Sequence, residues 1–135
     1  MKVVLDTNII LSSVSRYSPH RIVFDKFEQG RYTLCLTTEI LLEYEEKLDE
    51  IFSPMLAELI VGAMILKRNT LFQEVYIRWA LLSKDADDNK FVDCAVACNA
   101  KYLVSHDKHF NVLRNTPFPK VELISAADFK KVLQS

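Results

Sequence analysis

Short apolar runs and helical stripes alternate along the first third of the chain. Residues 2–5 form a β-branched apolar run that stops abruptly at Asp6, as expected of a central parallel strand covered on both faces. Residues 19–29 place apolar side chains at helical spacing, and Gly30 follows where a left-handed residue commonly ends a helix. Residues 32–36 then predict a second strand.

The middle of the chain predicts two consecutive helices. Thr37 or Thr38 is placed to cap the first, whose apolar stripe runs from Ile40 to Ile51. Ser53 followed by Pro54 is a strong start signal for the second, which we expect to end near Lys67. This second helix is apolar almost all round, so its outer face needs a cover from the core, from a second copy of the chain or from a partner.

The remaining residues continue the alternation, with one ambiguous segment. Residues 70–84 fit both a strand and a helix period, and we predict a strand near 74–79. The later elements are a helix capped by Asp87 or Asp88 and ending near 99, strands at 102–105 and 121–124, and a last helix beginning at Ser125 with Asp128 in its first turn. Such alternation predicts an α/β fold, a three-layer α/β/α sandwich with a mainly parallel central sheet, in a single domain over residues 1–135.

Composition and charge exclude several functions. The 135 residues include only two glycines, Gly30 and Gly62, so no Walker-type phosphate loop, dinucleotide fingerprint or nucleophile elbow can be written. Seventeen Lys and Arg residues against eighteen Asp and Glu residues leave a net charge of −1. The protein therefore does not bind nucleic acid by overall charge, and a polyanion must be held locally or through metal ions.

The chain carries the features of a cytoplasmic protein. Its three cysteines are an odd number without a C-x-x-C pair, and Asp6 interrupts the region where a signal peptide needs its apolar run. Cys94 and Cys98 stand one helical turn apart and are expected to be core thiols. The longest uninterrupted apolar run spans residues 59–66, too short to cross a bilayer.

Two predicted strands end in carboxylates. The first stops at Asp6, and the strand at 102–105 leads through Ser105 to Asp107. Ligands of open parallel sheets bind beyond the carboxyl ends of the strands. If the two strands are neighbours, Asp6 and Asp107 face one another across the crevice.

Two helical carboxylates extend this pattern. Asp88 falls on the buried side of its predicted helix, and Glu43 lies at the border of an apolar stripe. Few cations stand beside them: Lys47 is one turn from Glu43, and Lys90 is on the far side of Asp88. Acidic clusters of this kind bind Mg²⁺ or Mn²⁺, as one or two ions, which serve phosphodiester hydrolysis.

The segments that carry these acids resemble the PIN domain, a family of metal-dependent ribonucleases. They are residues 3–8 (VVLDTN), Thr38-Glu39 followed by Glu43, residues 85–91 (DADDNKF), and residues 100–107 (AKYLVSHD). The resemblance covers nearly the whole chain in order. It implies catalytic, metal-binding acids at Asp6, Glu43, Asp88 and Asp107, with Thr7, Asn8 and Ser105 as supporting polar residues.

The resemblance also implies partners. Many small bacterial members are toxins of toxin–antitoxin pairs, so an RNA substrate, an antitoxin protein and a homodimer are the expected partners. One departure is Ser105-His106, where the family often has Thr and Gly before the last Asp. Asp93 is a further candidate ligand, although the helical wheel places it away from Asp88, as a residue behind the ligands or on the surface.

Basic residues near the predicted crevice are candidates for gripping RNA phosphates. Arg16 and Arg21 follow the first strand, with His20 beside them, and Lys108 follows the last carboxylate, with His109 and Arg114 nearby. Phosphate contacts position a strand without reading its sequence. The three histidines are too scattered to predict a histidine metal site.

Other functions remain as alternatives at this point. A catalytically silent PIN-like module that binds RNA or protein is the main non-enzyme alternative. A haloacid-dehalogenase-like phosphatase would use Asp6 as nucleophile but needs a second aspartate where Asn8 stands. A receiver-type signalling module lacks its phosphoacceptor, because no Asp lies between Asp49 and Asp85.

Overall fold

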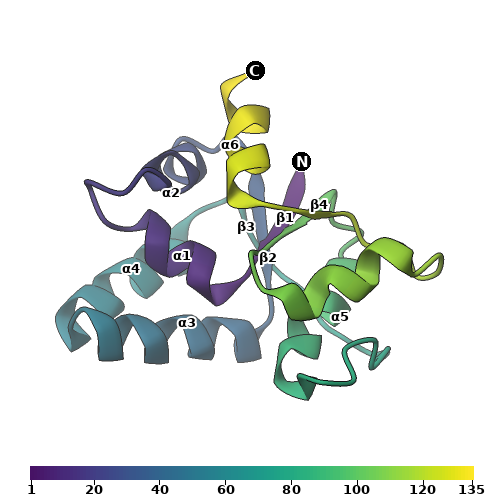
Figure 1. The fold of residues 1–135 in the computed structure, drawn as a ribbon. Coiled ribbons are helices and arrows are strands. Elements are labelled where there is room, and N and C mark those ends of the chain that lie inside the picture. The colour runs from purple at the N-terminus through teal and green to yellow at the C-terminus, as the bar shows by residue number, and fades with distance from the viewer.

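The computed structural model describes residues 1–135 and contains one sheet of five parallel strands, in the order β3-β2-β1-β4-β5 (Figure 1). The strands are β1 (Lys2–Leu5), β2 (Thr33–Leu36), β3 (Thr70–Phe72), β4 (Tyr102–Val104) and β5 (Leu123–Ile124). The predicted α/β fold with a parallel sheet is confirmed. The first and fourth strands are neighbours, as the placement of Asp6 and Asp107 required.

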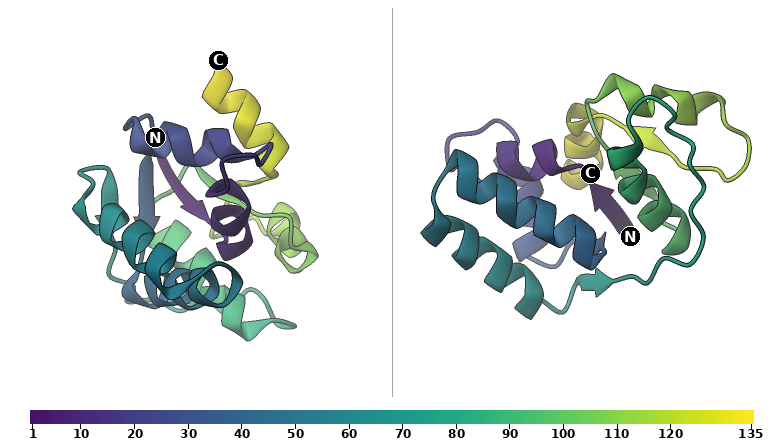
Figure 2. Two further views of the ribbon diagram at one scale, coloured as in Figure 1. Left: turned by 90° about the vertical axis from the view of Figure 1, so that its left-hand side faces the viewer. Right: turned by 90° about the horizontal axis from the view of Figure 1, so that it is seen from below.

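Helices cover both faces of the sheet. They are α1 (Thr7–Ser13), α2 (Arg21–Glu28), α3 (Thr38–Ile51), α4 (Pro54–Leu66), α5 (Asn89–Ala97) and α6 (Ala126–Gln134), with 3₁₀ segments η1 (Ala86–Asp88) and η2 (Lys108–Asn115). Figure 2 shows β1 between α5 on one side and α1 and α2 on the other. Helix α5 packs on β1, β2 and β4, whereas α6 packs on α2 and seats Phe129 against Tyr32 and Tyr102.

Local signals for the helix ends are largely confirmed. The side chain of Thr37 accepts a hydrogen bond from the Ile40 amide, and Ser53 and Ser125 cap α4 and α6 in the same way. Gly30 has a φ of +75°, the left-handed conformation expected beyond the end of α2. Asp88 occupies the capping position of α5 but makes no capping hydrogen bond, since the 3₁₀ turn η1 precedes it.

The prediction of a strand near 74–79 is wrong. The strand is β3, and its ladder with β2 ends where the Gln73 amide donates to the Leu36 carbonyl. Residues 73–82 lack regular structure, and Tyr76 and Ile77 are exposed, so the alternation that suggested a strand does not mark a buried face. Helix α1 and segment η2 were not predicted, because each is short and follows a strand end directly.

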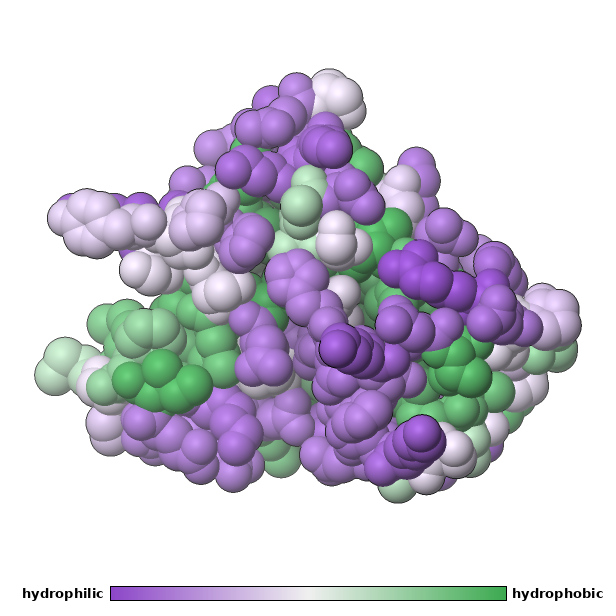
Figure 3. All heavy atoms as spheres, viewed as in Figure 1, coloured by the Kyte–Doolittle hydropathy of each residue, from purple (hydrophilic) through white to green (hydrophobic).

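The helical hairpin α3–α4 leaves apolar side chains uncovered. Helix α4 buries Ala57, Ile60, Val61 and Met64, but Met55 is 74% exposed and Leu66 is 84% exposed. Figure 3 shows this green patch at the left, whereas the centre of the same face, where β1 ends, is polar. No helix of the protein has the length and apolar character needed to span a membrane.

Candidate active site

A serine joins the ends of β1 and β4. Asp6 leaves β1 as the residue that precedes α1, and its amide donates to the Val104 carbonyl over 3.0 Å. The Ser105 hydroxyl donates to Asp6 Oδ2 over 2.7 Å and accepts from the Asp107 amide over 3.0 Å. Parallel pairing of the two strands thus brings Asp6 and Asp107 to one edge of the sheet, as predicted.

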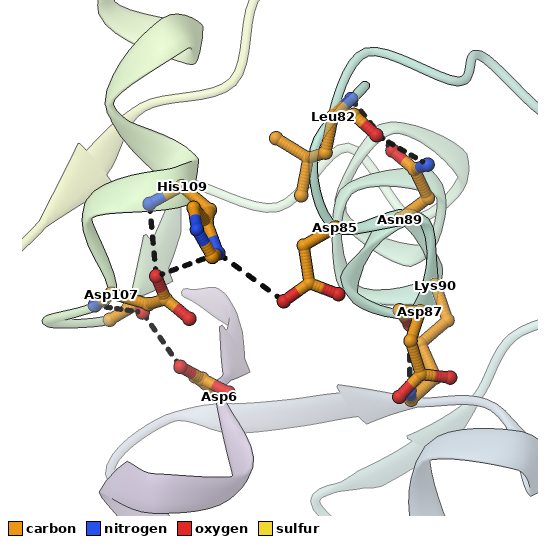
Figure 4. A network of polar contacts seen from close by, with 9 residues as sticks. Asp6, Leu82, Asp85, Asp87, Asn89, Lys90, Asp107 and His109 are labelled. Carbon is orange, nitrogen blue, oxygen red and sulfur yellow. Dashed lines mark hydrogen bonds and ion pairs between the residues drawn. The ribbon is translucent and has the colours of Figure 1, made fainter.

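Asp107 is connected to Asp85 through His109. The Asp107 carboxylate begins η2 by accepting from the His109 amide over 2.9 Å. The Nδ1 atom of His109 lies 3.3 Å from Asp107 Oδ1 and 3.3 Å from Asp85 Oδ2. Figure 4 shows the imidazole between the two carboxylates, with Asp6 below them. One imidazole nitrogen therefore contacts both carboxylates.

Asp88 completes a cluster of four possible ligands. One ligand atom from each of Asp85, Asp88, Asp107 and His109 lies within 4.8 Å of the others. Burial, a hydrogen bond with Asp85 and the charges of Asp6, Asp85 and Asp107 raise the pKa of Asp88 to about 8. The pKa of Asp85 is lowered, chiefly because Asp88 donates to it. In this arrangement Asp88 holds a proton that a bound cation would displace.

Asp6 is the buried member of the site. Its side chain is shielded by the ends of β1 and β4, and burial raises its pKa. The Ser105 hydroxyl and the Thr7 amide lower the pKa in part, whereas the charges of Asp107 and Glu43 raise it further. Asp6 therefore lies within electrostatic reach of both the strand-end carboxylate and the helical one.

Glu43 is held by two residues from other elements. Thr7 donates its hydroxyl to Glu43 Oε2, and Lys90 Nζ lies 2.8 Å from Glu43 Oε1. Lys90 is buried and also donates to the Asp87 carbonyl over 2.7 Å. Lys47 was the cation expected nearest to Glu43, and Lys90 was expected on the far side of Asp88, but the partner of Glu43 is Lys90. At the first turn of α5, Lys90 points across to α3 and not away from the site.

Asp93 lies on the other side of α5 and does not join the cluster. It is 3% exposed, and its Oδ1 accepts from the Trp79 amide over 3.0 Å. Burial raises its pKa, partly offset by the Trp79 amide and the charge of Arg78. The idea that Asp93 is a surface acid is wrong, because the irregular segment 73–82 crosses α5 and covers it.

A family model for the PIN domain matches residues 2–109, four-fifths of the chain. The chain belongs to the PIN-domain family. No curated protein shows significant sequence similarity to this PIN domain. The family assignment excludes the phosphatase and receiver alternatives, whose sites rest on other folds and motifs.

Solved structures show the same fold at low sequence identity. VapBC2 from Rickettsia felis, bound to a DNA fragment from its promoter, is 14% identical with a TM-score of 0.62, covering 93% of this chain and 98% of the other. VapBC-1 from nontypeable Haemophilus influenzae is 16% identical with a TM-score of 0.57, covering 94% and 99%. DNA-bound VapBC from Salmonella typhimurium is 15% identical with a TM-score of 0.57, covering 93% and 98%.

The other predicted site residues of this PIN domain differ from one another in exposure and in their hydrogen bonds. Thr7 is buried against Glu43, but Asn8 is exposed and makes no side-chain hydrogen bond. Arg16 is exposed, and Lys108 is exposed beside the acidic cluster. Arg21 is engaged within its own helix and the preceding turn, since it pairs with Asp25 over 2.9 Å and donates to the Val14 carbonyl over 2.6 Å.

Two members of the cluster were not among the predicted ligands. Asp85 was noticed only as part of a motif, and His109 was considered too far from the other histidines to bind metal. Both are identifiable by spacing: Asp85 stands three residues before Asp88 at the start of η1, and His109 stands two residues after Asp107 at the start of η2. The position of His109 beside carboxylates, and not beside other histidines, is what marks it as a possible metal ligand.

The donor set suits a hard divalent cation. Three carboxylates and one imidazole converge, and the raised pKa of Asp88 reflects first its burial and then the carboxylates held close to it. PIN domains are typically nucleases, and this one has an acidic cluster able to bind a divalent metal.

Proposed function

We propose that the protein is a Mg²⁺- or Mn²⁺-dependent endoribonuclease that hydrolyses phosphodiester bonds of single-stranded RNA. The observation that carries the proposal is the convergence of Asp85, Asp88, Asp107 and His109 beside Asp6, at the carboxyl ends of two neighbouring parallel strands. This is the edge at which open α/β sheets bind their ligands. Membership of the PIN-domain family supports the same activity.

Within this proposal, Asp6, Asp88 and Asp107 hold one or two divalent ions, with Asp85 and His109 at the outer side. A bound ion would lower the pKa of a water molecule and stabilise charge on the leaving oxygen. The chain's own task is to fix the ligands. Ser105 orients Asp6, and η2 fixes Asp107 through the His109 amide. We assign Asp93 no role in metal binding, only the structural role of accepting a hydrogen bond from the Trp79 amide.

Glu43 belongs to the proposed site, although Lys90 neutralises much of its charge. Its charge contributes to the raised pKa of Asp6, so the two carboxylates are near one another. Thr7 follows Asp6 directly and binds Glu43, which couples the end of β1 to α3. We infer that Glu43 tunes the charge at the metal site, with Thr7 and Lys90 fixing its position.

The proposed biological role is that of a cytoplasmic toxin controlled by an antitoxin protein. The solved structures with this fold are VapBC assemblies, which supports a protein partner for this chain. The uncovered apolar side chains of the α3–α4 hairpin, with Met55, Leu59 and Leu66 at their centre, offer a surface for that partner or for a second copy. A homodimer is therefore part of the same proposal.

The test is cleavage of a single-stranded RNA in Mn²⁺, with EDTA as the metal-free condition. Asp107→Asn should abolish cleavage while circular dichroism remains unchanged, and the exposed Asp49→Asn serves as a charge-matched control. If the parent protein binds Mn²⁺ but cuts no RNA, the alternative applies, namely a catalytically silent module that binds RNA or protein.

A further inference from the structure

A hollow of about 410 Å³ adjoins the acidic cluster and shares two residues with it. Asp85 and His109 form its inner end, where they also belong to the four-residue cluster. The rest of its lining includes Leu81, Lys84, Lys108 and Val112, which come from the segment before η1 and from η2. We call this hollow the flanking pocket.

The walls of the flanking pocket are fixed by hydrogen bonds and packing. The Leu82 amide donates to Asn89 Oδ1 over 2.9 Å, and Asn89 Nδ2 donates to the Leu82 carbonyl over 3.1 Å, so α5 holds the segment on one side. On the other side, η2 is anchored by the buried Phe110, whose ring packs edge-on against Phe91 of α5. The pocket is thus preformed, as binding sites for small groups usually are.

The charges on the rim complement a nucleic-acid backbone. Lys84 and Lys108 are both exposed, and neither takes part in an ion pair within the protein. Leu81 and the half-exposed Val112 add apolar surface to the same lining. Two cations without ion pairs and an apolar surface, next to a cluster of carboxylates, match the alternation of phosphate and base along a single strand.

We propose that the flanking pocket binds the nucleotide next to the scissile phosphate, with its base against Leu81 and Val112 and its outer phosphate between Lys84 and Lys108. This inference rests on the proposed ribonuclease function and names the residues that position the substrate. It predicts that the base must be unpaired, because a paired base in an A-form helix is stacked and cannot turn into the pocket.

The test compares kinetic constants of matched variants on a short single-stranded RNA in Mn²⁺. Lys84→Ala combined with Lys108→Ala should raise KM about tenfold and leave kcat within about twofold, since phosphate contacts contribute to binding. The slope of log(kcat/KM) against log salt should become shallower by about 0.7, the value for one phosphate that is no longer neutralised on a single strand. The control combines Lys120→Ala and Lys131→Ala, two exposed lysines outside the pocket, and should leave KM and the salt slope unchanged.

A second variant separates the base contact from the phosphate contacts. Val112→Thr, which keeps the shape and adds no charge, should raise KM on the single strand with little change in the salt slope, and annealing the complementary strand should protect the RNA from the parent enzyme. Parent-like KM values in both the lysine pair and Val112→Thr would overturn the flanking pocket while leaving the nuclease function intact. A parent protein that cleaves no RNA at all would instead overturn the proposed function and the pocket with it.

Discussion

Lys90 Nζ lies 2.8 Å from Glu43 Oε1, so a buried lysine of α5 neutralises a glutamate of α3 beside the acidic cluster. The pair divides the carboxylates of the site into two groups. Glu43 has its cation within the chain, whereas Asp6, Asp85, Asp88 and Asp107 have only His109 among them. A metal ion is therefore most needed on the side of β1, β4 and η2.

The first prediction concerns the stability of this ion pair. Lys90→Met should lower the free energy of unfolding by about 2–3 kcal/mol, because it leaves Glu43 partly buried without its cation. Adding Glu43→Gln should recover most of the loss. Urea unfolding in EDTA measures both, and an unchanged free energy in Lys90→Met would mean that water already compensates the pair.

The second prediction concerns Asp6. Asp6→Asn keeps an oxygen that can accept from Ser105 but removes one charge from the metal site, so kcat should fall at least about 100-fold, or ~2.7 kcal/mol of transition-state stabilisation. Without metal the variant should be as stable as the parent or more so, because burial already disfavours the Asp6 charge. Cleavage assays and thermal unfolding of parent, Asp6→Asn and Asp49→Asn decide the matter; a fully active Asp6→Asn contradicts the mechanism.

The third prediction is stabilisation by metal. Mn²⁺ or Mg²⁺ binds the folded cluster and not the dispersed unfolded chain, so at 100 times its Kd it should stabilise the protein by about 2.7 kcal/mol. The gain should appear as a higher melting temperature, and EDTA should reverse it. The variant combining Asp88→Asn and Asp107→Asn should lose the response. A melting temperature indifferent to Mn²⁺ would count against the site.

The fourth prediction is a pH dependence that Asp88 causes. Its pKa is about 8 in the folded protein, and about 3.9 when unfolded, so between these values the folded state holds one proton more. Stability without metal should therefore fall as pH rises from about 4 to about 8. Asp88→Asn should fall less over the same range, by urea unfolding in EDTA. Mn²⁺ affinity should rise with pH over the upper part of this range, because the ion displaces the proton.

The fifth prediction separates packing from chemistry. Cys35, Cys94 and Cys98 are buried free thiols within the hydrophobic core, as expected of core residues. Cys94→Ala and Cys98→Ala should each cost about 1 kcal/mol of stability through lost packing and leave kcat near the parent value. Loss of cleavage in a folded variant of either would contradict their assignment to the core.

The sequence was most informative where a short residue pattern agrees with a general rule of α/β folds. The apolar run before Asp6 and the one before Ser105 predicted two strands of a parallel sheet, which the structure makes neighbours, and Ser53-Pro54 predicted the start of α4. The irregular segment after β3 was misjudged because its Trp79 amide donates to Asp93 and not to a strand partner. No local pattern reveals such a side-chain contact with a distant amide.

The candidate site was predictable in part for the same reason. Strand ends project to a common edge, so Asp6 and Asp107 could be placed from sequence. Lys90 and His109 could not, because their roles depend on which way a single turn of α5 or η2 faces once the core has packed. A helical wheel gives the angle of Lys90 around its own axis but not the distance to α3.

The hydrogen bond from Ser105 to Asp6 joins residues 99 positions apart in the chain. During synthesis Asp6 leaves the ribosome first, and it has no partner until β4 and then η2 have followed. Since domains fold as units, the cation-binding edge does not exist in a chain that ends before this point. The proposed nuclease therefore has no assembled cation-binding edge until the residues of β4 and η2 have been synthesised and have packed beside β1.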